Sequence, residues 1–234
     1  MSTDIINNTN RNRAIAVTLI VVVFLTLGIG QHITSNKQSN SQGSLVITQL
    51  PSYSFPGQVQ TAPDFTLPSI TGQNYTFSSD AGKIRLVDFF YTKCPGNQGC
   101  ALITQNMAFI YDKLKQNNQL NQVKLISIDF DYINDTMTNL QAYAANYTQD
   151  TTNWQFLLGN AAQTNKTTSE WGFYYQVNNA TATTTTMNSG PKEPYIHTLM
   201  VYFIDQTGHW RYSAFGNTWT PNDAYTVISW LLTH

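Results

Sequence analysis

Two long apolar runs in the middle of the chain predict buried β-strands. They cover residues 84–91 and 123–130, and turn-forming residues bound them. Runs of this length are typical of strands buried on both faces of a sheet. After each run, apolar residues recur every three or four positions, as on one face of a helix. These positions are Ile103, Met107, Ile110, Tyr111 and Leu114 after the first run, and Met137, Leu140, Ala144 and Tyr147 after the second.

Shorter patterns predict elements on either side of these units. Residues 62–67 and 75–77 flank a turn at Gly72 and predict a hairpin that covers one edge of a sheet. Residues 154–159 predict a short strand, and residues 167–173 predict a third helix.

The carboxyl-terminal segment predicts a hairpin followed by a helix. His197 opens a strand predicted over residues 198–204, residues 205–208 supply the turn, and residues 209–214 return. Thr220 then provides an N-cap, followed by a proline at the first helical position. The buried stripe of this last helix is Ala224, Val227, Ile228 and Leu231.

Strands that alternate with helices and end in a hairpin and a helix predict an α/β fold. We expect a mixed central sheet flanked by helices. This is the order of elements in a thioredoxin-like fold, with an added N-terminal β-hairpin. We expect this domain over residues 62–234, which is long enough to bury a core.

The amino-terminal part is expected to lie outside that domain. Residues 14–30 are uncharged and rich in Ile, Val, Leu and Phe, with Arg11 and Arg13 before them and no Lys or Arg until Lys37. This asymmetry predicts that residues 1–13 stay in the cytoplasm and that the rest is exported. At about 17 residues, the run is just long enough for a transmembrane anchor. A cleaved signal peptide is the alternative, but no small-x-small cleavage site is convincing after Gly30.

Composition favours an extracytoplasmic setting. Residues 31–61 are rich in Ser, Gln, Asn and Thr and predict a flexible linker. Charged residues make up 11% of the chain and the net charge is −1, so electrostatics give no case for nucleic-acid binding. Neutral polar residues take the place of charges, and Asn-x-Ser/Thr sequons agree with an exported domain. These sequons lie at Asn74, Asn134, Asn146, Asn165 and Asn179.

Both cysteines of the chain, Cys94 and Cys100, lie between the first predicted strand and its helix. The partial positive charge of a helix start favours the thiolate form of a cysteine placed there. Two cysteines act as a pair, so a redox or metal site competes with a disulfide that closes a small loop. A structural disulfide gains little from closing so short a loop, which favours the redox or metal site.

Five features occur in one order along the chain. They are APDFTLPSITGQNYTF, RLVDFFYTKCP, LISIDFDYINDT, WQFLLG, and a lone His197 ahead of a D-x-x-G turn. Together they resemble the Sco/SenC family of copper-binding, thioredoxin-fold cytochrome oxidase assembly proteins. In that family two cysteines and a distant histidine bind copper, which is delivered to the binuclear copper centre of a haem–copper oxidase. The alternative role in the family is as a thiol–disulfide reductant for the cysteines of that centre. The resemblance implies that Cys94, Cys100 and His197 are ligands of Cu(I) or Cu(II) here.

The chain departs from the family pattern in two places. The family spacing is Cys-x-x-x-Cys, whereas Cys94 and Cys100 are separated by five residues and cannot share one face of a helical turn. The glycine-containing segment 95–99 must therefore fold back to bring the sulfurs together. Farther along, Asp129 is followed by Phe130 rather than by proline.

Other residues are weaker candidates for a metal site. His209, at a predicted turn, is the substitute for His197. Asp129, Asp131 and Asp135 suit a hard cation, but an irregular acidic segment is more often a solvated turn that caps a helix, so we assign them no metal. Two thiolates and one imidazole suit three-coordinate Cu(I), whereas zinc normally takes a fourth ligand.

We expect a membrane-anchored, extracytoplasmic copper chaperone whose partner is the copper-receiving subunit of a terminal haem–copper oxidase. The alternative is a thiol–disulfide oxidoreductase that acts on partner cysteines, although the usual Cys-x-x-Cys motif is absent. A peroxiredoxin is excluded, because its pattern requires proline and threonine where the chain has Val87 and Tyr91.

Overall fold

The structure is a computed structural model that describes residues 53–54, 59–95, 99–178 and 194–234. The predicted cytoplasmic segment, residues 1–13, and the predicted anchor, residues 14–30, lie outside these ranges, as does most of the predicted linker. Among the described residues, no helix combines the length and the apolar character needed to cross a bilayer.

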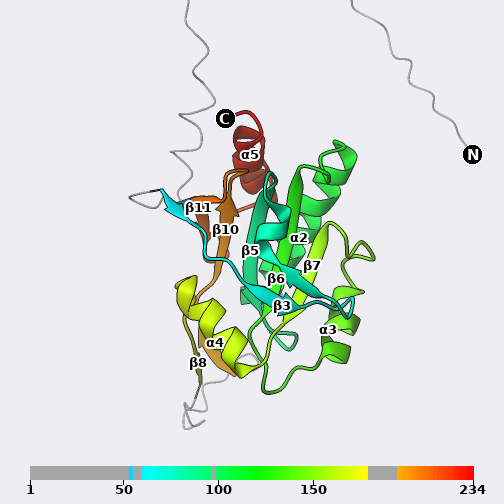
Figure 1. The fold of residues 1–234 in the computed structure, drawn as a ribbon, viewed down its shortest axis with the longest axis vertical. Helices are drawn as coiled ribbons and strands as arrows, with labels where there is room; N and C mark the ends of the chain where they lie inside the picture. Colours follow the sequence, from blue (N-terminus) through cyan, green and yellow to red (C-terminus); the bar gives the residue numbers. More distant parts are fainter. Residues whose placement is uncertain (1–52, 55–58, 96–98, 179–193) are drawn as a thin grey trace, which may run out of the picture. The chain divides into compact units, whose positions relative to one another are not determined.

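A mixed β-sheet forms the centre of the domain, as the sequence predicts (Figure 1). Its order is β1-β11-β10-β5-β6-β7, and β2 also pairs with β11. β5, β6 and β7 are parallel, whereas β10 runs antiparallel to β5 and β11. The strands are β1 (Tyr53–Ser54), β2 (Gln60–Thr61), β5 (Ile84–Phe90), β6 (Val123–Asp129), β7 (Trp154–Leu158), β10 (Met200–Ile204) and β11 (His209–Phe215). β1 and β2 lie within residues 31–61, which the composition predicts as a linker.

The predicted amino-terminal hairpin is present as a separate two-stranded sheet. It consists of β3 (Thr66–Pro68) and β4 (Asn74–Thr76). An antiparallel bridge between Ser69 and Leu157 places it against β7 at the edge of the central sheet. The hairpin therefore covers a sheet edge, as expected.

A second two-stranded sheet carries His197 and differs from the sequence prediction. It pairs β8 (Tyr175–Val177) with β9 (Tyr195–His197). The sequence places His197 at the start of the strand that returns to the central sheet, but His197 ends β9, and β10 begins only at Met200. The reason is that Thr198 continues the pairing with β8, since its N–H donates to the Tyr174 carbonyl at 2.8 Å.

Four α-helices and one short 3-10 helix complete the described residues. They are η1 (Phe77–Asp80), α2 (Gly99–Gln116), α3 (Met137–Ala144), α4 (Ala161–Glu170) and α5 (Pro221–Leu231). α2 and α5 follow the predicted stripes, whereas α3 ends at Ala144, before Tyr147 of its predicted stripe. α4 begins and ends earlier than the predicted helix over residues 167–173, because Asn160 and Gln163 form a capping box and Gly172 has a φ of 64°.

Alternate side chains of β5 face opposite layers of the fold. The Phe89 ring lies 4.5 Å from Phe173, which follows α4, whereas the Phe90 ring lies 5.0 Å from Tyr143 of α3. Every residue of β5 is buried. β5 is therefore the centre of the core, and the segment that follows it carries Cys94.

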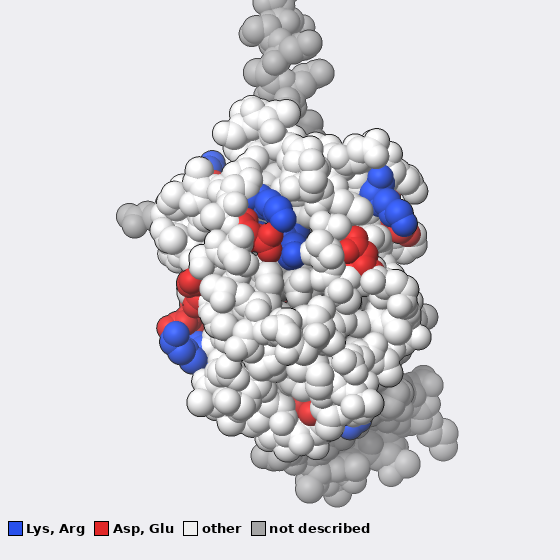
Figure 2. All heavy atoms as spheres, turned by 45° about the vertical axis from the view of Figure 1, so that its right-hand side comes forward, with Lys and Arg blue, Asp and Glu red and all other residues white. Residues whose placement is uncertain are grey.

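The surface carries few charged side chains. Figure 2 shows one face, on which small groups of acidic and basic side chains are separated by wide neutral areas. This view agrees with a chain in which charged residues make up 11% of the total.

Candidate metal centre

A tight turn after β5 and the start of α2 position the two cysteines. The Cys94 N–H donates to the Tyr91 carbonyl at 3.2 Å, which turns the chain directly after the strand. α2 begins at Gly99, whose φ of 59° is in the left-handed region that glycine tolerates. Cys100 is fully buried in the first turn of α2, and Cys94 is partly buried. A disulfide joins the two, so the structure shows the oxidised pair.

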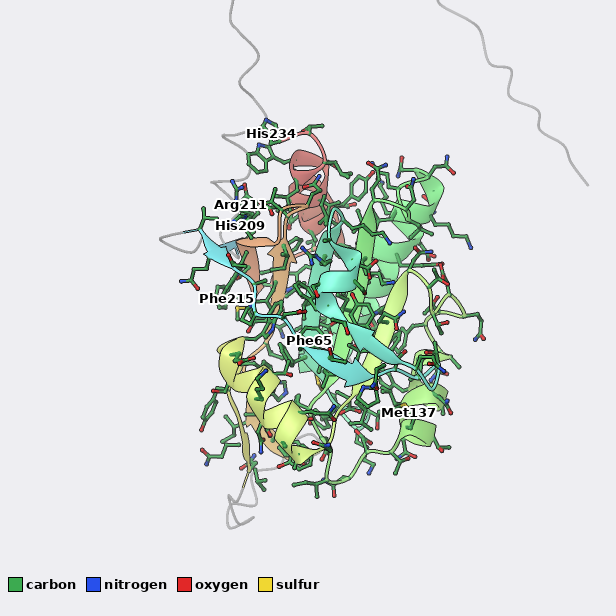
Figure 3. The ribbon with its side chains drawn as sticks, in the orientation of Figure 1. Phe65, Met137, His209, Arg211, Phe215 and His234 are labelled. Atoms are coloured by element: carbon green, nitrogen blue, oxygen red, sulfur yellow. A yellow bond between two sulfur atoms is a disulfide. The ribbon has the colours of Figure 1, made fainter. Side chains whose placement is uncertain are left out.

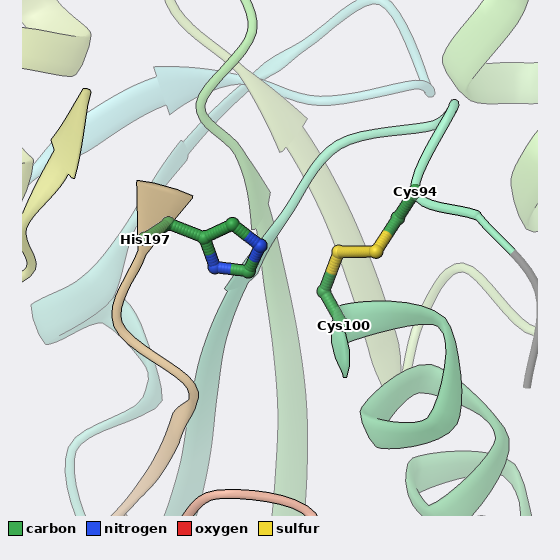
Figure 4. A group of neighbouring side chains, drawn as sticks. All are labelled: Cys94, Cys100 and His197. Carbon is green, nitrogen blue, oxygen red and sulfur yellow. A yellow bond between two sulfur atoms is a disulfide. The ribbon is translucent and has the colours of Figure 1, made fainter. Parts of the chain in front are cut away.

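His197 approaches the disulfide from β9, about one hundred residues farther along the chain (Figure 4). Its partly buried imidazole lies among aromatic rings, with centroid distances of 5.4 Å to Phe130, 5.8 Å to Tyr91 and 6.2 Å to Phe173. These rings provide an apolar wall behind the imidazole.

The structure brings together all three residues that the sequence nominates. One ligand atom each from Cys94, Cys100 and His197 lies within 4.8 Å of the other two. No other group of three or more His, Cys, Asp or Glu side chains with this geometry is found among the described residues. The five-residue separation of the cysteines therefore does not prevent a compact S2N group.

A hydrogen bond defines the tautomer of the His197 ring. Nδ1 lies 2.9 Å from the Thr198 carbonyl oxygen. A carbonyl only accepts, so Nδ1 carries the proton, and the lone pair of the neutral ring is on Nε2. Figure 4 shows the ring directed toward the sulfurs. This is the usual arrangement for a metal-binding histidine, in which a backbone group orients the ring through its other nitrogen.

The three aspartates at and after the end of β6 are buried, which corrects the solvated turn favoured by the sequence analysis. Asp129, Asp131 and Asp135 have exposed fractions of 0%, 3% and 5%. Asp135 accepts hydrogen bonds from the backbone and hydroxyl of Thr92, and Asp131 accepts one from the Tyr195 hydroxyl at 2.6 Å. Sequence reasoning did not single out Tyr195. The pattern that could have found it is its position two residues before His197, on the same side of a strand.

Burial also changes the charge state expected for Asp129. Burial, followed by the nearby charge of Asp135, raises the pKa of Asp129 well above its ordinary value. Asp129 accepts the Asp131 N–H at 2.9 Å, which only partly offsets this effect. The carboxyl nearest the end of β6 is therefore held in its neutral form more readily than an exposed aspartate.

His209, the substitute ligand considered from the sequence, belongs to a different part of the domain. It is the first residue of β11, and its Nδ1 lies 2.6 Å from the Thr207 hydroxyl. Figure 3 shows it with Arg211 and His234 near the carboxyl end of α5. His209 is not part of the group formed by the cysteines and His197.

Comparison with known proteins gives a family match over most of the chain. The family model described as SCO1/SenC matches residues 55–233. The SCO1 protein homolog of Bacillus subtilis (strain 168) is 36% identical over 95 residues, which are 41% of this chain and 47% of that protein. The chain thus matches about half the length of this relative.

Solved structures of Sco proteins share the fold. Arabidopsis thaliana ScoI with copper bound has a TM-score of 0.59 and 17% identity, with 75% of this chain and 100% of that chain covered. BsSco, a member of the Sco family of cytochrome c oxidase assembly proteins in which a disulfide switch was identified, has a TM-score of 0.56 and 24% identity, with coverages of 75% and 93%. These likenesses confirm the predicted thioredoxin-like fold.

Proposed function

This chain belongs to the SCO1/SenC family, and we propose that it binds copper through Cys94, Cys100 and His197 and delivers it to a terminal haem–copper oxidase. The convergence of the three ligand atoms within 4.8 Å carries this proposal. Metal bonds to sulfur and nitrogen of about 2.0–2.3 Å allow the ligand atoms of one ion to lie at most about 4.6 Å apart. Small side-chain movements therefore suffice to form the site.

The relatives support the choice of metal and the class of partner. Copper is bound in the Arabidopsis thaliana protein, and BsSco belongs to a family of cytochrome c oxidase assembly proteins. Two soft thiolates and one imidazole also suit Cu(I) on chemical grounds. The copper-receiving subunit of a haem–copper oxidase is accordingly the partner that we propose.

Copper binding must follow reduction of the disulfide, because a disulfide offers no thiolate. An external dithiol supplies two electrons and two protons, becomes a disulfide itself, and leaves Cys94 and Cys100 as thiols. Cu(I) then displaces the two thiol protons and gains a third bond from Nε2 of His197. Delivery occurs when ligands of the partner replace these bonds. The positive end of α2 favours the thiolate of Cys100.

We also propose that the domain is extracytoplasmic and held at the membrane by residues 14–30, with residues 1–13 inside. The apolar run, its basic amino-terminal flank and the sequons of the domain support this topology. The expected result is that protease added to intact cells or spheroplasts digests the domain. Protection until the membrane is permeabilised would contradict the orientation.

An anaerobic titration of the reduced protein with Cu(I) tests the copper site. We expect one copper ion per chain, none in the oxidised protein, and a loss of binding in Cys94→Ala and Cys100→Ala. His197→Ala should weaken Cu(I) affinity at least about tenfold, because it removes one of three ligands. His209→Ala is the matched control and should bind like the unaltered protein. Full affinity in His197→Ala would exclude this residue from the site.

A thiol–disulfide oxidoreductase is the second candidate, because the structure shows Cys94 and Cys100 joined as a disulfide. In that function the pair would exchange with cysteines of a partner protein. A reduction potential within the range of cellular dithiols, together with no uptake of Cu(I) by the reduced protein, would favour this function over copper delivery.

A further inference from the structure

We infer that residues 131–135, the bridging loop, fix the distance between the cysteine sulfurs and the His197 imidazole. The Asp135 side chain is hydrogen-bonded to the segment that carries Cys94, and the Asp131 side chain is hydrogen-bonded to the strand that carries His197. The inference rests on the proposed function, because it assigns positioning residues to the same copper site.

The first contact reaches the cysteine segment. Asp135 accepts the Thr92 N–H at 2.9 Å and the Thr92 hydroxyl at 2.5 Å, two residues before Cys94. The Lys93 ammonium adds a bond to the Asn134 carbonyl at 3.2 Å. Asp135 is only 5% exposed, so little water competes for its oxygens. Hydrogen bonds to a carboxylate are among the stronger ones in proteins.

The second contact reaches the histidine strand. The Tyr195 hydroxyl donates to Asp131 at 2.6 Å, and the Asn134 side-chain amide donates to the Tyr195 oxygen at 3.1 Å. Tyr195 lies two residues before His197, so the two side chains project from the same side of β9. A shift of Tyr195 relative to the bridging loop would therefore carry the imidazole with it.

The bridging loop is itself a closed turn. The Asp131 carbonyl accepts the N–H groups of Asn134 at 3.2 Å and of Asp135 at 2.9 Å. The Asp131 N–H donates to the Asp129 carboxyl group at the end of β6, and the Thr136 side chain caps the start of α3 directly after the loop. Both contacts thus start from one internally hydrogen-bonded loop between β6 and α3.

The central sheet alone does not fix the position of His197. β9 has three residues and, within the described ranges, pairs only with the equally short β8. An isolated two-stranded hairpin is at best marginally stable. The Tyr195–Asp131 hydrogen bond attaches this hairpin to the loop that also holds the cysteine segment. We therefore assign Asp131, Asp135, Tyr195 and Thr92 as positioning residues.

The test compares two Tyr→Phe substitutions in the same hairpin. Tyr195→Phe removes the hydroxyl bonded to Asp131 but keeps the buried ring. Tyr174→Phe is the matched control, because the Tyr174 hydroxyl is bonded to Gln176 of β8 itself. We expect Tyr195→Phe to weaken Cu(I) affinity of the reduced, full-length protein about tenfold, as is typical when a residue that orients a ligand is lost. Tyr174→Phe should leave the affinity unchanged.

A double-mutant cycle shows whether Tyr195 acts through His197. Adding Tyr195→Phe to His197→Ala should cause no further loss of affinity. Thr92→Val, which removes the bond to Asp135 on the cysteine side, should weaken binding in both backgrounds. Equal Cu(I) affinities of Tyr195→Phe and Tyr174→Phe would overturn this inference and leave the proposed copper site intact. An undiminished effect of Tyr195→Phe in the His197→Ala background would do the same. Full affinity in His197→Ala itself would instead reject the ligand set, and the inference with it.

Discussion

The two ends of strand β5 hold buried polar groups in opposite ways. At the amino-terminal end, Arg85 is 2% exposed, its guanidinium lies 4.3 Å from the centroid of the Phe77 ring, and it donates to the carbonyls of Phe77 and Asp205. On the next strand, the buried Lys124 ammonium lies 3.4 Å from Asp80. Each buried cation here has an anion or carbonyl oxygens as partners.

At the carboxyl-terminal end, buried carboxyl groups are held without cations. Asp131 and Asp135 accept hydrogen bonds from hydroxyl and backbone groups, and the pKa of Asp129 is raised by burial. No ion pair to any of these three aspartates is found among the described residues. Aromatic rings surround the imidazole of His197 instead.

This difference between the two ends of β5 suggests that one end contributes mainly to stability and the other mainly to the proposed copper site. Removing one partner of a buried ion pair leaves an uncompensated charge, so substitutions at the amino-terminal end should lower the free energy of unfolding strongly. At the other end, Asp131 and Asp135 accept from hydroxyl, amide and backbone groups, and the ammonium of the exposed Lys93 donates to the Asn134 carbonyl rather than to a carboxylate. These contacts lie beside the proposed copper ligands. We therefore expect substitutions at the amino-terminal end to change stability, and those at the carboxyl-terminal end to change copper affinity.

The largest effect on stability is expected for Asp80→Asn. This substitution keeps the shape of the side chain but leaves the buried Lys124 without its anion. The free energy of unfolding should fall by about 3 kcal/mol, the usual cost of removing one partner from a buried pair. Urea unfolding of the oxidised protein at pH 7 measures it.

Two further measurements test whether the effect of Asp80→Asn comes from the buried pair and is confined to stability. Lys83 is the other cation bonded to Asp80, and its side chain is 33% exposed. Lys83→Gln should therefore lower the free energy of unfolding by less than about 1 kcal/mol. The Cu(I) affinity of reduced Asp80→Asn should match that of the unaltered protein. A parallel loss of copper affinity would show that the two ends of β5 are not independent.

An intermediate effect, visible only as a pH dependence, is expected at Asp88 in the middle of β5. Burial raises the pKa of Asp88 to about 7, and the hydrogen bond from Ser127 at 2.6 Å offsets only part of this. The folded protein therefore holds this proton more tightly than the unfolded chain, in which the pKa is 3.8. The free energy of unfolding must then decrease as the pH rises, by about 2 kcal/mol between pH 5 and pH 7.

Asp88→Asn should flatten this pH dependence, because an amide does not titrate. The measurement is urea unfolding at pH 5, 6, 7 and 8 for both proteins. Some slope should remain in the variant, since the pKa of Asp129 is raised as well. Identical slopes in the two proteins would show that Asp88 is already ionised in the folded state at pH 5.

The elements predicted correctly from the sequence are those whose buried residues are mostly apolar. β5, β6, α2 and α5 have such patterns. α4 was misplaced because its buried positions are Thr164, Thr167 and Thr168, which no hydrophobic period reveals. β9 was missed because three residues are too few to establish an alternation.

The candidate site divides in the same way. The two cysteines were singled out by residue type and by their place between a strand and a helix, and His197 was added to the proposed ligands by the family resemblance, although the cysteine spacing departs from the family pattern. The burial of Asp131 and Asp135 was not, because it depends on partners about sixty and forty residues away, Tyr195 and Thr92. A carboxylate in a loop has no local pattern that distinguishes a solvated group from one enclosed by distant segments. Only the tertiary structure supplies that distinction.

The smallest effect is expected for Lys166→Ala on α4. Lys166 and Glu170 form an ion pair at 3.7 Å, but their side chains are 67% and 41% exposed, whereas those of Lys124 and Asp80 are 7% and 10% exposed. Because water solvates and screens the exposed pair, its removal should change the free energy of unfolding by less than about 0.5 kcal/mol. Added salt should erase even that difference. A loss of stability comparable to that of Asp80→Asn would mean that burial does not explain the importance of the Asp80–Lys124 pair.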